Sequence, residues 1–370
     1  MKPYEIINHI VDDLLCSHFK DDYCLLHFPD HIRYNPNQQD PMFLFDKHFI
    51  AVPKQSQSIF DYFFHNNKWI IEKSVTYRLR HSVGNIFVNH SWEPIYTELD
   101  KDFWNYLNKE VEKSKNLKKC TYVLHSEVSS KEINILKNQN IKHVYWFAHA
   151  YLCSEFYFKH YKKFNMVCNY KVRPIVYKWL SANRLLRSHR TDLLEQLDLS
   201  QGCYSLLNPD PNGLKYTGPI PAHSFDSHEN HSAEICIDKL TPWNTSFLHV
   251  VNETVWQDKI HFTEKIFKPI VMHQPFVVVQ APGSLKYLQS YGFKTFGDWW
   301  DESYDDIQDP AERLQAIAKI INDIGSKDII ELEKLRMEMA GVLEHNFHHF
   351  YENIPAIVLV ELENNIRLLS

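Results

Sequence analysis

The sequence predicts an α/β protein built from two Rossmann-like, doubly wound domains that face a cleft. The chain has 370 residues, which is more than one hydrophobic core usually supports. Short apolar runs of strand length alternate with helical patterns in both halves, as in parallel sheets covered by helices. Hydrophobic residues make up 44% and charged residues 23%, as in an ordinary globular chain. With only 9 glycines, the fold cannot rest on glycine-rich phosphate loops.

The first domain is expected over residues 1–168. Its helices are predicted at 6–19 and 99–119, with a third that begins after Ser129 or Ser130, since either serine can cap it. Its strands are predicted at 23–28, 42–52, 85–89, 121–124 and 143–149. A strand, a helix and a strand at this spacing imply a parallel sheet.

The second domain is expected over residues 169–345, after a basic and aromatic stretch at 159–173. Its strands are predicted at 176–180, 247–251 and 276–279, and its helices at 183–197, 263–272, 285–291, 311–325 and 329–350. Residues 208–233 are rich in Pro, Gly, His and Ser, which indicates a loop or surface insertion. Residues 346–370 end in a helix that could return to the first domain.

Charge and cysteine content exclude several classes of protein. The chain carries 40 basic and 46 acidic residues, a net charge of −6, so it is not a generally cationic nucleic-acid coat, although a local basic patch remains allowed. Its 7 cysteines form no CxxC motif, which favours free thiols in a reducing compartment. The N-terminus does not resemble a signal peptide and no apolar run is long enough to span a bilayer. We therefore expect a cytoplasmic protein with no membrane partner.

A first candidate site follows the predicted strand at 176–180. Asn183, Arg184, Arg187, His189 and Arg190 stand together at the expected start of a helix. Because a helix N-terminus disfavours cations, such a cluster suggests an anion between them, and arginine forks match phosphate oxygens. The alternative is a solvated basic helix face with ordinary salt bridges.

A second candidate site combines Glu253 with Thr263, Glu264 and Lys265. Thr263 can cap the helix that begins at Glu264, whose carboxylate can accept hydrogen bonds from a ribose diol. Lys265 can meet the charge of a pyrophosphate. The alternative is a capping threonine followed by a helix-favouring glutamate.

The acidic residues near 301–305 offer oxygen ligands for Mg²⁺ or Mn²⁺, but a loop of turn-forming residues is favoured, and no metal is expected.

These segments together resemble a known family. Four motifs occur in order along the chain: Asn-Arg-x-x-Arg-x-His-Arg at 183–190, Val-x-Glu-Thr at 251–254, Phe-Thr-Glu-Lys-x-Phe-Lys-Pro at 262–269, and Gly-Phe-Lys-Thr-Phe with Asp-Glu-Ser-Tyr-Asp at 292–305. This order resembles a group of glycosyltransferases of tailed phages and large DNA viruses. The Thr-Glu-Lys piece is also similar to the donor site of α-1,3-fucosyltransferases and exostosin-type enzymes. The resemblance covers roughly residues 120–320 and none of the first 115 or so.

The resemblance implies the GT-B fold and a nucleotide-sugar donor, most simply a UDP-sugar, bound by the second domain. By analogy Glu264 would hold the ribose, while Arg184, Arg190 and Lys265 would face the diphosphate. Such enzymes generally neutralise the leaving diphosphate with cations and helix dipoles, so no cofactor or metal is required. For a viral enzyme the compartment would be the host cytoplasm. The unmatched first domain would bind the acceptor.

The catalytic base and the acceptor are less constrained. An inverting transfer needs a general base, for which Glu127 is the first candidate and His149 the second, with His90 and Glu93 behind them, whereas a retaining transfer needs none. The preferred acceptor is hydroxymethylated cytosine in duplex DNA, by glucosyl- or arabinosyl-type transfer. Five residues would form the basic DNA-binding surface: Lys159, Lys162, Lys163, Lys171 and Arg173. The alternatives are a glycan or protein acceptor, and a non-catalytic nucleotide- or sugar-binding module.

Overall fold

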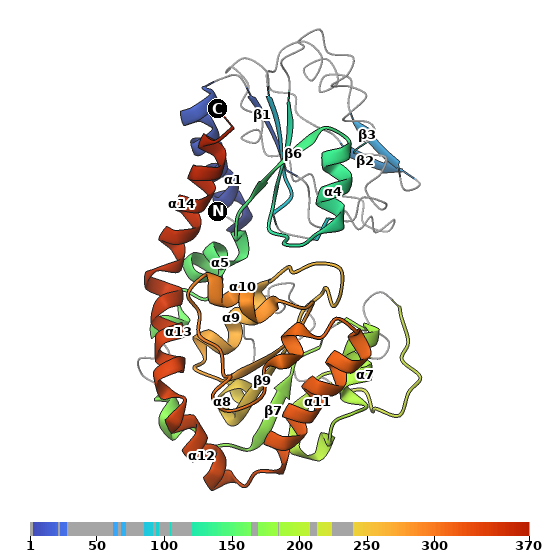
Figure 1. Ribbon diagram of the computed structural model, residues 1–370, viewed down its shortest axis with the longest axis vertical. Coiled ribbons are helices and arrows are strands. Elements are labelled where there is room, and N and C mark those ends of the chain that lie inside the picture. Colours follow the sequence, from blue (N-terminus) through green and yellow to red (C-terminus); the bar gives the residue numbers. More distant parts are fainter. Residues whose placement is uncertain are drawn as a thin grey trace. The chain divides into compact units, whose positions relative to one another are not determined.

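The chain folds as an α/β protein that divides into two compact units (Figure 1). The computed structural model describes residues 3–20, 23–27, 62–65, 68–71, 85–91, 94–95, 104, 120–163, 169–183, 185–207, 213–223 and 240–369. The first unit contains residues 1–149 and 357–370, and the second contains 150–356. The strand expected at 42–52 and nearly all of the helix expected at 99–119 lie outside the described residues.

The division falls after residue 149 rather than at the expected boundary of 168 and 169. The segment that was assigned by its composition to the end of the first domain packs on helices of the second unit. Tyr351 donates a hydrogen bond to the Phe158 carbonyl at 2.7 Å, and Arg336 donates one to the Arg173 carbonyl at 2.8 Å. The Tyr351 contact, which composition does not reveal, joins the part of the expected first domain around Phe158 to the second unit, whereas Arg173 was already expected there.

The first unit is built on a parallel sheet with the strand order β1-β4-β5-β6. Its elements are α1 (Pro3–Phe19), β1 (Tyr23–His27), the antiparallel pair β2 (Tyr62–His65) and β3 (Lys68–Ile71), β4 (Asn85–Asn89), β5 (Thr121–His125), α4 (Lys131–Asn138), β6 (Ile141–Tyr145) and α5 (Ala148–Leu152). Every residue of β5 is buried, as expected for a strand inside a parallel sheet, and its apolar residues lie between Thr121 and His125.

The C-terminal helix α14 (Ile354–Arg367) supplies the last part of the first unit. Glu361 accepts a hydrogen bond from the Phe147 backbone N–H at 3.2 Å. Asn365 donates one to the Tyr145 carbonyl at 2.7 Å. The end of the chain thus closes against the segment that follows β6. Among the described residues, no helix combines the length and apolar character needed to cross a membrane.

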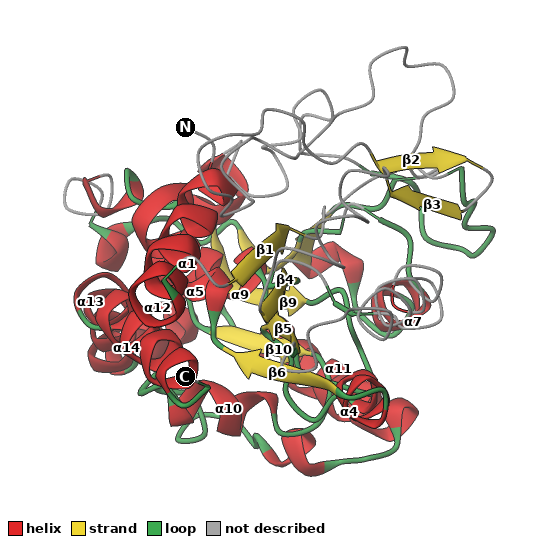
Figure 2. Cartoon of the chain, turned by 90° about the horizontal axis from the view of Figure 1, so that it is seen from above, coloured by secondary structure: helices red, strands yellow, loops and turns green. Residues whose placement is uncertain are grey.

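The second unit is built on a second parallel sheet, with the strand order β10-β9-β7-β8. Its longer elements are β7 (Tyr177–Ser181), α7 (Ser188–Leu194), β8 (Gly202–Tyr204), α8 (Leu240–Thr245), β9 (Ser246–Asn252), α9 (Glu264–Val271), β10 (Phe276–Val279), α10 (Ser284–Ser290), α11 (Pro310–Ser326), α12 (Ile329–Glu338) and α13 (Ala340–Glu352). Short helical turns are η1 (Cys153–Tyr157), η2 (Tyr170–Val172), η3 (Leu199–Gln201) and η5 (Ser303–Asp306). Strands β9 and β10 are buried throughout and lie between α9 and α11 (Figure 2).

Two predicted helices differ from those observed. The helix expected at 183–197 begins only at Ser188, because Arg187 has an extended backbone with φ −149° and ψ 141°. The single helix expected at 329–350 is two helices, α12 and α13, joined at Met339, which is fully buried. The first difference matters for function, because it removes Arg187 from the helix and places it on the strand-to-helix connection.

Candidate functional site

The candidate site lies where the connections that leave two neighbouring strands diverge. The chain runs from β7 to β8 on one side of the sheet and then crosses to β9 on the other side, so the paths after β7 and β9 separate at their carboxyl ends. Ligands of open parallel sheets bind at such a switch point. Both predicted donor segments follow these two strands, so the fold brings them to the same edge of the sheet.

Buried hydroxyl and amide groups join the strand ends beneath this edge. Asn183 and Asn252 each donate a hydrogen bond to the Ser181 hydroxyl at 2.9 Å. Ser205 donates to the Asn183 carbonyl at 3.0 Å and accepts from the Asn183 N–H at 2.8 Å. Of these four residues only Asn183 was predicted from the sequence, whereas Ser181, Ser205 and Asn252 were not. Their position as polar residues at the ends of apolar strands could have pointed to them. Asn183 therefore braces the strands rather than reaching outward.

Arg190 is a buried structural residue and not an open phosphate ligand. Its side chain is only 4% exposed. Its guanidinium donates to the carbonyl oxygens of Leu185 at 3.0 Å, Asn252 at 3.1 Å and Glu253 at 3.3 Å. Burial and the charge of Arg187 lower the pKa of Arg190 to about 10, so it stays cationic at neutral pH. These hydrogen bonds from the Arg190 guanidinium connect α7 to the end of β9.

His189 is a neutral partner of the same loop. Its Nε2 donates to the Glu253 carbonyl at 3.1 Å, and its ring stacks on Trp256 with centroids 5.8 Å apart. The guanidinium carbon of Arg313 lies 4.1 Å from the centroid of the same indole. Burial, with a smaller contribution from Arg190, lowers the pKa of His189 to about 3. His189 therefore contributes no charge to a phosphate and instead holds the loop that follows β9.

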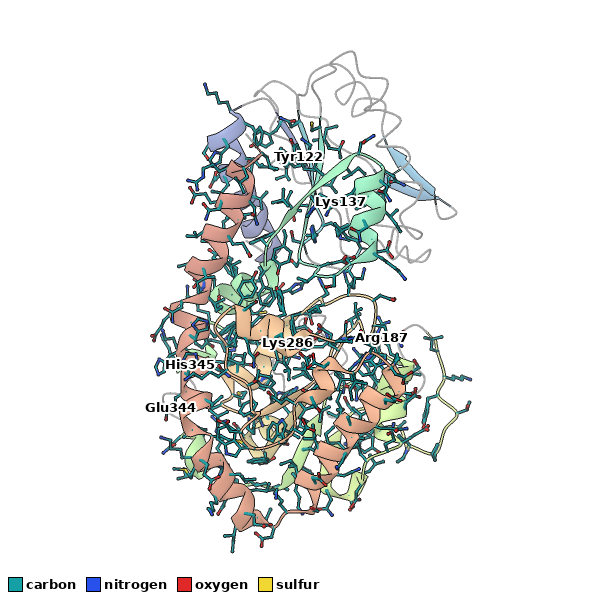
Figure 3. All side chains as sticks on the ribbon, in the orientation of Figure 1. Tyr122, Lys137, Arg187, Lys286, Glu344 and His345 are labelled. Atoms are coloured by element: carbon teal, nitrogen blue, oxygen red, sulfur yellow. The ribbon has the colours of Figure 1, made fainter. Side chains whose placement is uncertain are left out.

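Arg187 is a cation at this edge whose side chain makes no hydrogen bond within the described residues. It occupies the N-cap position of α7 and is half-buried (Figure 3). Its Nε is buried and has no hydrogen-bond partner within the described parts of the chain. Arg187 lies close enough to Arg190 and His189 to lower the pKa of both. Arg187 was predicted only as a member of the anion-binding cluster, whereas the diphosphate was assigned to Arg184, Arg190 and Lys265. Of these three, Arg190 is engaged internally and Arg184 lies outside the described residues, so Arg187 is the better candidate.

Glu253 is a buried carboxylate that fixes the start of α9. It is 0% exposed, and it accepts hydrogen bonds from the Thr263 backbone N–H at 3.1 Å and from the Thr263 hydroxyl at 2.7 Å. Thr263 is the N-cap residue of α9, but its hydroxyl bonds to Glu253 instead of capping the helix, which corrects the expected role. Burial raises the pKa of Glu253, and Lys265 and Thr263 oppose this rise. Glu253 is thus too enclosed to contact a donor directly.

Glu264 and Lys265 form the part of the second segment that reaches the surface. Their side chains are 12% and 24% exposed. The Lys265 ammonium donates to the Thr263 hydroxyl at 2.9 Å and to Glu264 Oε1 at 3.1 Å, and it lies 3.9 Å from Glu253 Oε2. The charges of Glu253 and Glu264 both act on Arg190, so the two segments share one electrostatic site.

The acidic segment at 301–306 serves the backbone. Asp305 accepts hydrogen bonds from the N–H groups of Leu285 at 3.0 Å and Lys286 at 3.3 Å, at the start of α10. Glu302 accepts one from the Phe296 N–H at 2.7 Å. The described part of the chain contains no group of three or more His, Cys, Asp or Glu side chains placed to hold a metal ion. The Gly-Ser turn before α10 is therefore occupied by a side chain of the protein itself.

The two predicted catalytic residues lie in the first unit and are both buried. Glu127 follows β5, and its Oε1 accepts a hydrogen bond from the Ile95 N–H. His149 lies on α5 and is likewise buried. Sequence reasoning missed His125, the last residue of β5. Its Nδ1 accepts a hydrogen bond from the Glu127 backbone N–H, so in the neutral ring the proton is on Nε2, which donates to His143 Nδ1 at 3.2 Å. Burial lowers the pKa of His125 to about 3.

The five basic residues predicted to bind DNA all lie in the second unit and differ in their surroundings. Lys159 is 71% exposed and pairs with Glu155 at 3.6 Å. Lys163 is exposed, and the Lys162 ammonium lies 5.6 Å from the ring centroid of Tyr351. The other two are engaged within the protein: Lys171 pairs with Glu344 at 2.7 Å and Arg173 donates to the Met272 carbonyl at 2.7 Å.

No protein-family model matches the chain, and a search of curated proteins gives no match either.

Proposed function

We propose that the protein is a glycosyltransferase that binds a nucleotide sugar, most simply a UDP-sugar, at the carboxyl ends of β7 and β9. The observation that carries this proposal is the combination, at the switch point of a parallel sheet, of an arginine with no hydrogen-bond partner in the described parts of the chain and a partly exposed Glu-Lys pair. Arg187 comes from the connection after β7, and Glu264 and Lys265 come from the first turn of α9, after β9.

Each of these groups suits one part of the donor. Arg187 and Lys265 offer cations to the diphosphate, and the N-terminus of α9 adds the partial positive charge of the helix dipole. The negative charge that develops on the leaving diphosphate would be stabilised by the same groups. Glu264 offers carboxylate oxygens to the ribose diol. The nucleotide sugar is a co-substrate, and the proposal includes no bound cofactor.

The first experiment is a thermal-shift panel of nucleoside diphosphates and nucleotide sugars, followed by a turnover assay with each binder. A ligand that binds only the folded state stabilises it by mass action and so raises the midpoint temperature of unfolding. At a ligand concentration a hundredfold above Kd, the stabilisation is about 2.7 kcal/mol. We expect one nucleoside diphosphate to raise the midpoint of unfolding and Arg187→Ala to remove that rise. Absence of a shift for every nucleotide would refute the proposal. Donor binding without turnover would favour a non-catalytic binding module.

Glu127 is proposed as the general base of an inverting transfer. Glu127→Gln keeps an oxygen that can accept from the Ile95 N–H but cannot take a proton. General bases contribute about 10²–10⁴-fold, so we expect kcat to fall at least a hundredfold with donor affinity unchanged. His149→Gln is the matched test for the second candidate. Unchanged kcat in both variants would exclude them as bases and favour a retaining transfer.

The proposed acceptor is a hydroxymethylated cytosine in duplex DNA. The exposed lysines of the segment 159–163 are the residues that support it. Lys162→Glu with Lys163→Glu should weaken DNA binding and reduce its salt dependence, because phosphate contacts release counterions with a slope near −0.9 per phosphate. The assay offers hydroxymethylated DNA, plain DNA and glycan acceptors side by side with the donor that binds. Transfer to a glycan or protein alone would replace DNA as the acceptor.

A further inference from the structure

Two neighbouring strands of the first unit, β4 and β5, end in turns of the same kind. Asn89, the last residue of β4, accepts a hydrogen bond from the Ser91 backbone N–H at its side-chain oxygen, at 3.3 Å. His125, the last residue of β5, accepts one from the Glu127 backbone N–H at Nδ1, at 3.2 Å. Asparagine closes such a turn readily, as Asn89 shows. The turn therefore needs no imidazole, and what histidine adds at position 125 is its second ring nitrogen.

This second nitrogen connects the turn to His143 on β6. His125 Nε2 donates to His143 Nδ1 at 3.2 Å, and the two strands that carry these rings are paired along their length. A neutral imidazole has one donor nitrogen and one acceptor nitrogen. Because Nδ1 is the acceptor in both rings, each ring carries its proton on Nε2. A proton added to one ring therefore changes which bonds the other ring can make.

His143 is the ring of this pair that takes up a proton first. His125 is 2% exposed, and burial, followed by the charges of His143, His90 and Lys137, lowers its pKa to about 3. His143 is half-buried, and burial, followed by Lys137 on α4, lowers its pKa from 6.5. Helix α4 packs on β6 (Figure 1). The ring of Tyr145 meets His125 edge-on, with centroids 5.7 Å apart. As the pH falls below 6.5, His143 therefore becomes charged while His125 stays neutral.

We propose that His143 is a pH sensor that acts on the Glu127 turn through the tautomer of His125. When a proton from solvent binds His143 at Nδ1, that nitrogen becomes a donor and faces the Nε2–H of His125. Two donors cannot share one hydrogen bond, so His125 exchanges its proton with water and carries it on Nδ1 instead of Nε2. The pair gains one proton in total. His125 Nδ1 can then no longer accept from the Glu127 N–H, and the turn opens.

The shift of tautomer is favoured over separation of the two rings. A hydrogen bond from a charged donor is about twice as strong as one between neutral groups. After the shift, charged His143 donates to His125 Nε2, whereas the bond that is lost joined a neutral ring to the Glu127 backbone. The Ile95 N–H still donates to Glu127 Oε1, so the turn loosens with its side chain retained.

The switch goes beyond the proposed function, and only its effect on transfer rests on that function. Glu127 is the proposed base, and its backbone is held by His125 at neutral pH. His125 is then a positioning residue, and sugar transfer would weaken on the acid side as His143 becomes charged. The shift of tautomer itself needs no substrate.

The test follows ring nitrogens and backbone amides of the full chain by NMR between pH 7.5 and 5, with no ligand present. We expect His125 to change from the Nε2–H to the Nδ1–H tautomer in step with the charging of His143. Protection of the Glu127 amide from hydrogen exchange should fall about two- to tenfold relative to the Ser91 amide, the range that one neutral hydrogen bond supports. Ser91 is the internal control, because Asn89 closes its turn and does not titrate.

Two substitutions to asparagine isolate the two steps. His143→Asn keeps an acceptor near the position of Nδ1 but cannot take up a proton, so the ratio of Glu127 to Ser91 protection should stay constant with pH. His125→Asn should close the turn as Asn89 does, and its ratio should also stay constant. A general loosening of the first unit in acid would instead change both amides together in every variant. Thermal midpoints identify a variant that is not folded, and His143→Asn alone suffices where His125→Asn fails to fold.

Two results would overturn the switch. One is a His125 ring that keeps its proton on Nε2 while His143 becomes charged. The other is a Glu127 to Ser91 ratio that changes with pH in His143→Asn as it does in the parent. Failure of the proposed function is recognised separately, because these measurements use no donor or acceptor. An unchanged kcat in Glu127→Gln removes the base and leaves the switch intact.

Discussion

Arg187 and Arg190 provide a matched pair of substitutions at one site. Arg190 makes three hydrogen bonds to backbone carbonyls and is only 4% exposed, whereas Arg187 makes none that the described residues reveal. Each hydrogen bond from a charged group contributes about 1.5–3 kcal/mol, although the terms do not add fully. Arg190→Ala also leaves the Asn252 and Glu253 carbonyls without this donor. We expect it to lower the free energy of unfolding by about 3–5 kcal/mol.

The companion substitution should act on binding instead. Arg187→Ala removes no hydrogen bond that the described residues make, so its effect on the free energy of unfolding should stay within about 0.5 kcal/mol. If Arg187 meets the diphosphate, losing a charged hydrogen bond of about 1.5–3 kcal/mol lowers affinity roughly 10- to 100-fold. Urea unfolding followed by tryptophan fluorescence measures the first quantity and calorimetry with UDP the second.

Reversed results would refute this reasoning. A stable Arg190→Ala protein with weakened UDP binding would show that Arg190 contacts the ligand and that its internal bonds are dispensable. Full UDP affinity in Arg187→Ala would remove Arg187 from the site. Arg190→Lys adds a graded control, because it retains a cation but cannot reproduce the fork that reaches three carbonyls. It should fall between the parent and Arg190→Ala in stability.

Three further predictions concern stability. Folding lowers the pKa of four buried histidines from 6.5 to about 3: His125, His189, His249 and His273. Between these two pH values the unfolded chain therefore binds more protons than the folded chain. The free energy of unfolding should fall by about 1.4 kcal/mol per pH unit for each histidine as the pH drops below 6.5. Unfolding measured from pH 7.5 to 4.5 checks this, and His249→Leu should reduce the slope by one proton; an unchanged slope would contradict the assignment. Gly292→Ala should destabilise the second unit by about 1–3 kcal/mol in urea unfolding, because φ is +90° and the new Cβ would lie 2.8 Å from His349 Nε2. Asp305→Ala should cost about 1–2 kcal/mol, with or without added Mg²⁺, since it uncaps the first N–H groups of α10; a loss that appears only with Mg²⁺ present would indicate a metal site.

The strands were the most predictable part of the fold. The runs at 121–124, 247–251 and 276–279 coincide with β5, β9 and β10 within one or two residues, because strands buried on both faces are continuously apolar. The start of α7 was not predictable from its residues. Arg187 has an extended backbone directly before Ser188, although its neighbours in sequence favour a helix. The Asn183 N–H bonds to Ser205, a contact between neighbouring strand ends that no local pattern encodes.

The candidate site was predictable in its segments but not in the division of roles within them. Arg187 and Arg190 are the same residue type three positions apart, and what separates them is the distant loop after β9 that supplies carbonyl acceptors to Arg190 alone. Glu253 and Glu264 are separated in the same way, since burial against Thr263 makes the first a brace and leaves the second partly exposed. Sequence shows which groups are charged, whereas tertiary burial decides which of them can meet a ligand.

The buried charges also explain how an acidic chain can attract an anion to this edge. The whole chain carries −6, yet Arg187, Arg190 and Lys265 outnumber Glu253 and Glu264 by one positive charge at the switch point. Three of these five groups are fixed by internal hydrogen bonds to buried partners, so the local field is set by the fold and needs little reorganisation when charge arrives. A local excess of this kind steers anions independently of the net charge. Association of UDP should therefore slow as salt increases, and neutralising Arg187 should remove most of that dependence, whereas neutralising the remote, exposed Lys159 should leave it unchanged.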